Sequence, residues 1–125
     1  VLFRSDKNEY LEKTGHKTLE ANNKKLYEIK ANKMPIAIYD KMDRFTTHEF
    51  KYKKGDCFYL FSDGYADQFG GNKGRKFKYK PFKKLLLNNS DKTMKEQKKI
   101  LENNFNKWKG DLEQIDDIVI IGIKI

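Results

Sequence analysis

The chain has 125 residues, with 27 Lys or Arg against 18 Asp or Glu, a formal net charge of +9, 38% hydrophobic residues and a single cysteine. This length supports one domain with a modest core, and one cysteine excludes an intramolecular disulfide and a cysteine-rich zinc site. No apolar run reaches the roughly 18 residues of a membrane helix, and no charged-then-apolar leader opens the sequence, so we expect no membrane contact within this segment.

The first half of the chain predicts short strands joined by polar segments. Residues 2–4 form a candidate strand, whereas residues 5–23 are polar and poorly patterned, which favours a loop, an insertion or a weak hairpin. Residues 26–29 and 47–52 alternate between apolar and polar side chains and predict strands. Residues 34–39 are apolar, but Pro35 cannot donate a backbone hydrogen bond, so we expect a loop or an edge segment there.

The second half predicts a buried strand, two helices and a last strand. Residues 57–61 are apolar and aromatic, as in a buried strand, and residues 62–64 end it. Pro81 suits the first position of a helix, and Thr93 with Glu96 fits a capping box that opens a second helix ending at Gly110. The apolar stripe of the second helix predicts core packing, and its members are Met94, Ile100 or Leu101, Phe105 and Trp108.

Residues 118–125 are almost all apolar and β-branched, which predicts a strand covered on both faces for most of its length. Strands followed by two helices and a strand indicate an α+β layer fold for residues 1–125. Cys57 is expected to pack as a small apolar group, and His16 and His48 are expected at the surface because neither has ligand partners at metal-site spacing.

Residues 72–84 carry seven basic side chains and no acid, with Phe77, Tyr79 and Phe82 among them. Basic groups interleaved with aromatic rings can bind single-stranded nucleic acid, so a small basic domain that binds nucleic acid or another polyanion is the alternative function. Against it, only Arg4, Arg44 and Arg75 of the basic residues are arginine, the preferred residue for phosphate and guanine contacts. A solvated lysine surface with inward-facing rings is the simpler interpretation, and a nucleic-acid partner is not favoured.

Two acidic sites stand out by their positions. Asp63 follows the end of one predicted strand, and Asp116 and Asp117 precede the start of another, so the carboxylates converge if these strands pair antiparallel. Clustered carboxylates without His or Cys suit hard cations such as Mg²⁺ or Mn²⁺. Gly64 lets backbone or substrate approach Asp63 closely. The alternative is that these acids are ordinary turn residues.

The order of these motifs resembles the C-terminal half of SpoIIE-like metal-dependent protein phosphatases, of the PPM (type 2C) superfamily. The resemblance rests on Gly55-Asp56, on Leu60-Phe61-Ser62-Asp63-Gly64-Tyr65-Ala66-Asp67, and on Asp116-Asp117-Ile118, with residues 33–36 similar to the stretch before the central strand. It covers residues 26–125.

The resemblance implies part of a β-sandwich flanked by helices, with a two-metal Mn²⁺ or Mg²⁺ centre. Asp63 and Asp116 would be metal ligands, with Gly64, Asp67 and Asp117 as neighbours of the metal site. The implied reaction is hydrolysis of phosphoserine or phosphothreonine on a protein by water that the metals activate, and no catalytic protein nucleophile is required.

One family motif is missing. The family has an Asp in an Asp-x-x-Gly-His-Gly-type motif that bridges both metals, and Gly15-His16 lacks both the Asp and the second Gly. We therefore expect this motif upstream of Val1, the chain to be the C-terminal part of one phosphatase domain, and the isolated chain to be inactive. A degenerate phosphatase module that binds proteins is a third reading.

The resemblance also implies a phosphorylated protein as partner, of which a regulator of an alternative sigma factor is one candidate. We expect a cytoplasmic location, with membrane tethering through upstream domains left open.

Overall fold

Antiparallel strands and helices alternate along the chain in the computed structural model, which describes residues 1–6, 9–13, 15–34, 40, 42–49 and 51–125. The elements are β1 (Leu2–Ser5), α1 (Glu9–Lys13), β2 (Lys17–Ala21), β3 (Lys24–Glu28), β4 (Cys57–Phe61), α2 (Gly64–Asp67), β5 (Phe69–Gly70), β6 (Arg75–Lys76), α3 (Tyr79–Asn89), α4 (Met94–Lys109) and β7 (Ile120–Lys124).

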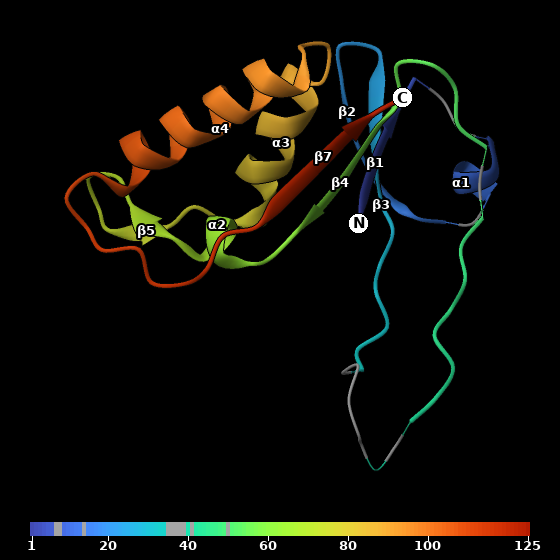
Figure 1. The fold of residues 1–125 in the computed structure, drawn as a ribbon, viewed down its shortest axis with the longest axis horizontal. Coiled ribbons are helices and arrows are strands. Elements are labelled where there is room, and N and C mark those ends of the chain that lie inside the picture. The colour runs from blue at the N-terminus through green and yellow to red at the C-terminus, as the bar shows by residue number, and fades with distance from the viewer. Residues whose placement is uncertain (7–8, 14, 35–39, 41, 50) are drawn as a thin grey trace.

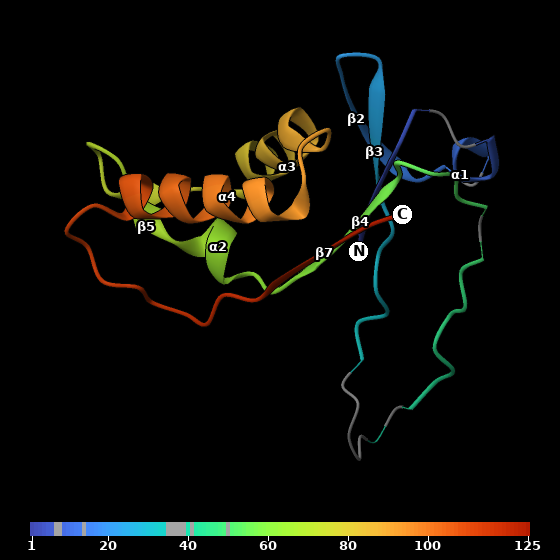
Figure 2. The same ribbon diagram turned by 45° about the horizontal axis from the view of Figure 1, so that its top comes forward.

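Five strands form one antiparallel sheet in the order β2-β3-β1-β4-β7, and β5 pairs with β6 in a separate hairpin. Helices α3 and α4 lie on one side of the sheet, and the short helix α1 lies beyond β1 and β3 (Figures 1 and 2). The predicted α+β class is confirmed. None of the helices in the described ranges is both long and apolar enough to cross a membrane.

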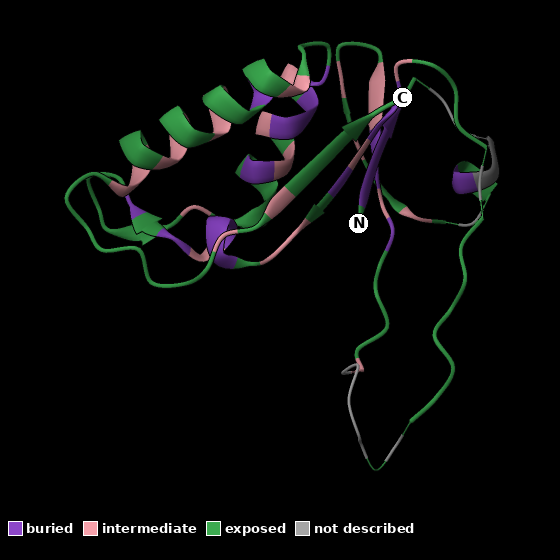
Figure 3. Ribbon diagram, viewed as in Figure 1, coloured by how far each residue is buried: buried purple, intermediate pink, exposed green. Residues whose placement is uncertain are grey.

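The main core fills the space between the sheet and α3 (Figure 3). Side chains from alternate positions of β1, β3 and β4 meet apolar residues of α2 and α3; the buried members are Leu2, Leu26, Cys57, Tyr59, Tyr65, Phe82, Leu86 and Leu87. A second, smaller cluster lies on the opposite face, where Leu11 of α1 covers Phe3, Tyr27 and Ile29. Cys57 is buried and free, as predicted.

The signals at the ends of α4 are confirmed. Thr93 is the N-cap: its side chain accepts a hydrogen bond from the Glu96 amide, and the Glu96 carboxylate accepts one from the Thr93 amide. Gly110 ends the helix with a positive φ of 55°. Helix α3 begins at Tyr79, two residues before Pro81, which therefore lies in the first turn.

The first half of the chain differs from the sequence-based predictions in two segments, and a third segment lies mostly outside the described residues. Within residues 5–23, expected to be a loop or weak hairpin, the structure forms α1 and strand β2, which pairs with β3. The prediction of a strand at 47–52 is wrong for residues 47–49 and 51–52, which are exposed and pair with no strand of the described chain. Within the predicted loop or edge segment 34–39, residues 35–39 lie outside the described residues, as does residue 50.

The prediction that the last strand is covered on both faces is also wrong. Val119, Ile121, Ile123 and Ile125 are 53%, 51%, 48% and 41% exposed. They share the face of the sheet opposite to α3 and α4, whereas Ile120 packs with the main core. Hydropathy predicted the strand, but the face away from the helices has no cover at β7 within the described chain.

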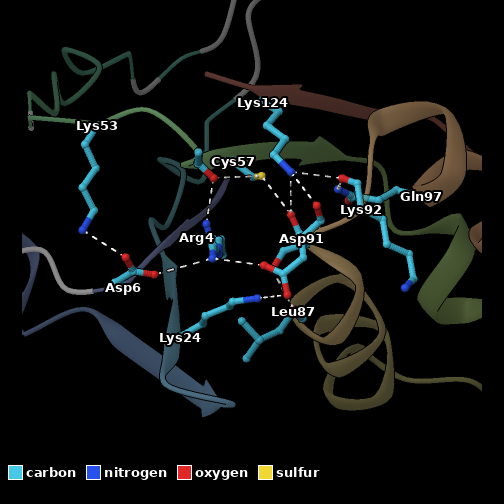
Figure 4. A network of polar contacts seen from close by, with 12 residues as sticks. Arg4, Asp6, Lys24, Lys53, Cys57, Leu87, Asp91, Lys92, Gln97 and Lys124 are labelled. Carbon is cyan, nitrogen blue, oxygen red and sulfur yellow. Dashed lines mark hydrogen bonds and ion pairs between the residues drawn. The ribbon is translucent and has the colours of Figure 1, made fainter.

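A polar network fastens the sheet to the turn between α3 and α4 (Figure 4). The buried Arg4 side chain donates to the Gly55 carbonyl at 2.7 Å and lies 3.6 Å from Asp91, which also pairs with Lys24. The Lys124 ammonium donates to the carbonyl oxygens at the end of α3, those of Ser90, Asp91 and Lys92. Cations beside such carbonyls favour the helix end because they balance its negative dipole.

Candidate metal centre

The antiparallel pairing of β4 with β7 brings the two acidic sites to the same end of the sheet. Phe61 lies opposite Ile120, and the Ser62 amide continues the ladder with a 3.0 Å hydrogen bond to the Val119 carbonyl. The condition for the two acidic sites to converge, antiparallel pairing of these strands, is therefore met, and Asp63 and Asp116-Asp117 flank the pair on facing chain segments. Figures 1 and 2 show the segment between α4 and β7 running beside β5 and α2 before it enters the sheet.

Gly64 explains how closely these segments approach. A Cβ added at this buried position would overlap the Asp117 carbonyl oxygen and lie 3.1 Å from Cγ1 of Ile118. Since both obstacles belong to the strand entry that carries the second acidic site, only glycine permits this spacing. The absence of a side chain at Gly64 therefore serves the close approach of the two acidic segments.

Two polar side chains hold the Asp116 segment in place, and the sequence reasoning assigned a role to neither. The Ser62 hydroxyl donates to the Asp117 carbonyl at 2.9 Å and accepts from the Val119 amide at 3.0 Å. Gln68 is fully buried, and its Nε2 donates to the Glu113 carbonyl at 2.8 Å. The one available signal was a Ser directly before Asp63; nothing local marks Gln68.

The carboxylates at this end of the sheet differ in how they are engaged. Asp63 is the exposed N-cap of α2, but its side chain forms no capping hydrogen bond. Asp116 is exposed, and its Oδ1 accepts from the Asp117 amide at 2.8 Å. Asp67 is already paired with Lys76 at 3.0 Å. Asp63 and Asp116 are therefore better placed than Asp67 to accept a cation.

Exposed aspartate oxygens suit Mg²⁺ or Mn²⁺, so the residues at the strand ends fit such an ion in their chemistry. Their number is small: across the described ranges, no group of three or more His, Cys, Asp or Glu side chains is arranged to hold a metal ion. Fewer than three such side chains therefore gather at any one place in the described ranges.

The basic stretch lies next to these acids. The Phe77 amide donates to the Gln68 carbonyl at 2.9 Å and the Lys78 amide to the Ala66 carbonyl at 2.7 Å, which fastens residues 77–78 to α2 and β5. Burial raises the pKa of the Tyr79 phenol, and the negative charges of Asp63 and Asp67 raise it further. Tyr79 therefore lies within the electrostatic reach of the candidate ligands.

A groove of about 650 Å³ lies between α4 and β7, lined by residues such as Met94, Leu101, Phe105, Gln114 and Ile120. Neither Asp63 nor Asp116 lines it. The groove is a space between packed elements, and the chemistry of the site lies outside it. His16 and His48 contact each other, with ring centroids 5.8 Å apart, far in sequence from the acidic residues.

Comparisons with known proteins identify the family and the fold. The profile of the family described as Stage II sporulation protein E (SpoIIE) matches residues 16–125. Among solved structures, the SiaA-PP2C domain of Pseudomonas aeruginosa is 25% identical with a TM-score of 0.73; the match covers 99% of this chain and 42% of that one. No curated protein matches. The chain thus spans less than half of that structure, and it belongs to the SpoIIE family of PPM-type protein phosphatase domains.

Proposed function

We propose that this chain contributes the Asp63–Asp116 side of the metal centre in a phosphatase that hydrolyses phosphoserine or phosphothreonine on a protein. Asp63 and Asp116 would each give carboxylate oxygens to Mn²⁺ or Mg²⁺, with Asp117 and Asp67 beside them. The observation that carries this proposal is the β4–β7 pairing, which brings both acidic segments to one end of the sheet. Family membership supplies the reaction class.

The roles of the chain's own residues follow from their contacts. Ser62 ties the entry of β7 to the end of β4, and Gly64 keeps the two backbones close. Gln68 anchors the segment that leads to Asp116. Bound divalent cations would supply positive charge to the phosphoryl oxygens and lower the pKa of the attacking water. Ser62, Gly64 and Gln68 would position the metal ligands and would form no covalent bond with the substrate.

We further propose that the 125-residue chain alone turns over phosphopeptides slowly or not at all. The support is the donor count, since two carboxylates leave most of the six oxygen positions of a divalent cation to water. The missing bridging acid of the family would come from a segment preceding Val1, which would also cover the exposed face of β7.

The test compares two proteins: this chain, and the same chain extended by the coding sequence that precedes it. Release of phosphate from a phosphoserine peptide is measured with Mn²⁺ and with chelator. We expect metal-dependent turnover only in the extended protein, and its loss in Asp63→Asn and in Asp116→Asn. Each exchange keeps the side-chain volume but removes a charged ligand. Asp111→Asn, in the same acidic segment, is the matched control and should keep activity.

Equal turnover by the extended protein and its Asp63→Asn and Asp116→Asn variants would refute the ligand assignment. Rapid metal-dependent turnover by the 125-residue chain alone would refute the proposal that its metal site is partial. We propose a phosphorylated protein as the substrate, with a regulator of an alternative sigma factor as one candidate, and the cytoplasm as the site of action.

A further inference from the structure

Five cations of the basic stretch have no acidic partner among the described residues. Lys76 pairs with Asp67 and Lys83 with Glu28. The remaining five form no ion pair with any described residue, and we call them the basic strip: Lys73, Arg75, Lys78, Lys80 and Lys84. All five are exposed. Two of the seven basic side chains therefore hold the segment to the rest of the protein through ion pairs, and the other five are available to bind an external anion.

The strip begins beside the candidate metal ligands. The hairpin of β5 and β6 follows α2 directly, and α2 begins at the residue after Asp63. Lys78 marks the junction: its φ of 74° and ψ of 156° belong to a region that is essentially restricted to glycine, and such strain is often kept where function needs a fixed geometry. The hydrogen bond that its backbone amide donates to the Ala66 carbonyl holds that conformation next to α2.

Charges of opposite sign are segregated at this end of the molecule. Residues 111–117 carry four acids and no base, whereas the strip carries no acid. A phosphorylated protein that approaches the acidic segment is repelled unless other charges attract it. The strip can supply that attraction, which is screened beyond a Debye length of about 8 Å at physiological salt.

Two of the three aromatic rings of the stretch face the core, whereas Tyr79 is 42% exposed. Phe82 is fully buried, and the Phe77 ring packs 5.3 Å from Trp108 and 5.4 Å from Tyr65. Binding of single strands depends on exposed rings for base stacking, and these two rings are already engaged. Tyr79 is the one exposed ring of the stretch, and it contacts Phe61 with ring centroids 6.3 Å apart. The surface is therefore mainly electrostatic, which favours carboxylates over stacked bases as its contacts.

We propose that the basic strip is the docking surface for acidic residues that flank the phosphorylated serine or threonine of the protein substrate. This inference rests on the proposed function, and it adds a substrate class: phosphoproteins whose phosphorylation site lies in an acidic sequence. The lysines act as point charges with flexible stems, so they select net negative charge and not one fixed sequence.

The test measures binding without catalysis. A fluorescein-labelled phosphoserine peptide with glutamates on both sides is titrated with the 125-residue chain in chelator at low salt, and anisotropy is recorded. A peptide with glutamines in place of the glutamates tests whether binding depends on negative charge. Oligothymidylate tests whether the surface binds single-stranded nucleic acid instead. We expect the glutamate peptide to bind about tenfold more tightly than the glutamine peptide, with affinity falling as salt rises.

Matched variants locate the surface. The pair Lys78→Glu with Lys80→Glu and the control pair Lys95→Glu with Lys99→Glu on α4 both lower the net charge from +9 to +5. We expect about a tenfold loss of affinity in the first pair only. Far-UV circular dichroism checks folding, and the milder pair Lys78→Gln with Lys80→Gln should show a smaller loss in the same direction.

Equal losses in both charge-reversal pairs, or equal binding of the glutamate and glutamine peptides, would overturn the docking surface. Tighter binding of oligothymidylate, lost only in the Lys78/Lys80 pair, would also overturn it and reassign the strip to nucleic acid. Because chelator prevents turnover, docking can be established even if the chain hydrolyses nothing. Conversely, the Lys78→Glu and Lys80→Glu pair can be placed in the extended protein. If that variant hydrolyses phosphopeptides with the same KM as the unaltered extended protein, the proposed function stands and the docking surface is refuted.

Discussion

Gly64→Ala tests whether close backbone approach holds the two acidic segments together. The added Cβ would overlap the carbonyl oxygen of Asp117 and press on Ile118 at 3.1 Å. A carbonyl fixed in the entry to β7 cannot move aside alone, so the β4 and β7 ends must separate. Overpacking of this kind costs about 1–3 kcal/mol, and the reduced entropy of the unfolded chain returns about 0.5–1 kcal/mol. We expect a net loss of about 1–2 kcal/mol.

Gly122→Ala is the matched control. Its Cβ would lie 2.8 Å from Sδ of Met94, the flexible end of a side chain that can rotate away. With a urea m-value of about 2 kcal/mol per molar, the midpoint of Gly64→Ala should fall by about 0.5–1 M, and that of Gly122→Ala by much less. An unchanged midpoint for Gly64→Ala, or a larger fall for Gly122→Ala, would refute the backbone-clearance argument.

Three further predictions concern the core and its charges. In Tyr59→Phe, the buried Oε1 of Gln97 loses its 2.8 Å donor, so urea unfolding should show a loss of about 1–3 kcal/mol; a change below about 0.5 kcal/mol would contradict this. The hydrogen bond from Lys83 lowers the pKa of Glu28 below its usual 4.5, so the pair stabilises the fold above that pH and the gain disappears as pH falls through the lowered pKa. Unfolding of Lys83→Gln should differ from wild type at pH 7 and converge with it in acid, and a constant difference would argue against the pair. Burial raises the pKa of Cys57, so an aromatic disulfide reagent at mild alkaline pH should label the native chain far more slowly than the urea-unfolded one, and similar rates would show that the thiol is exposed.

Elements specified by local chemistry were predicted well. The capping box of Thr93 and Glu96 and the stop at Gly110 depend on residues within one helical turn, so their positions follow from the sequence alone. The apolar run of β4 likewise needed no knowledge of its neighbours. Residues 47–52 had the right period in the sequence, but residues 47–49 and 51–52 pair with no strand of the described chain, and a strand exists only through its ladder of hydrogen bonds.

The candidate site was predictable only in part. Asp63 and Asp116 could be singled out because both lie at strand ends, and the family resemblance linked them. Ser62 and Gln68 could not, because their contacts join residues 55 and 45 positions apart. The exposure of β7 could not be predicted for a related reason. Hydropathy indicates that a side chain prefers burial, but whether another layer covers it depends on residues far away in the sequence or in other chains.

The contact of Lys124 with the end of α3 has a consequence for strand register. The sequence of residues 118–125 repeats Ile and Val so closely that a slip by two residues would keep apolar side chains on both faces. Only one register places the lone ammonium of β7 on the carbonyls of Ser90, Asp91 and Lys92. A two-residue slip would move Asp116 by about 7 Å relative to Asp63. A lysine at the far end of the strand thus fixes the alignment on which the acidic pair depends.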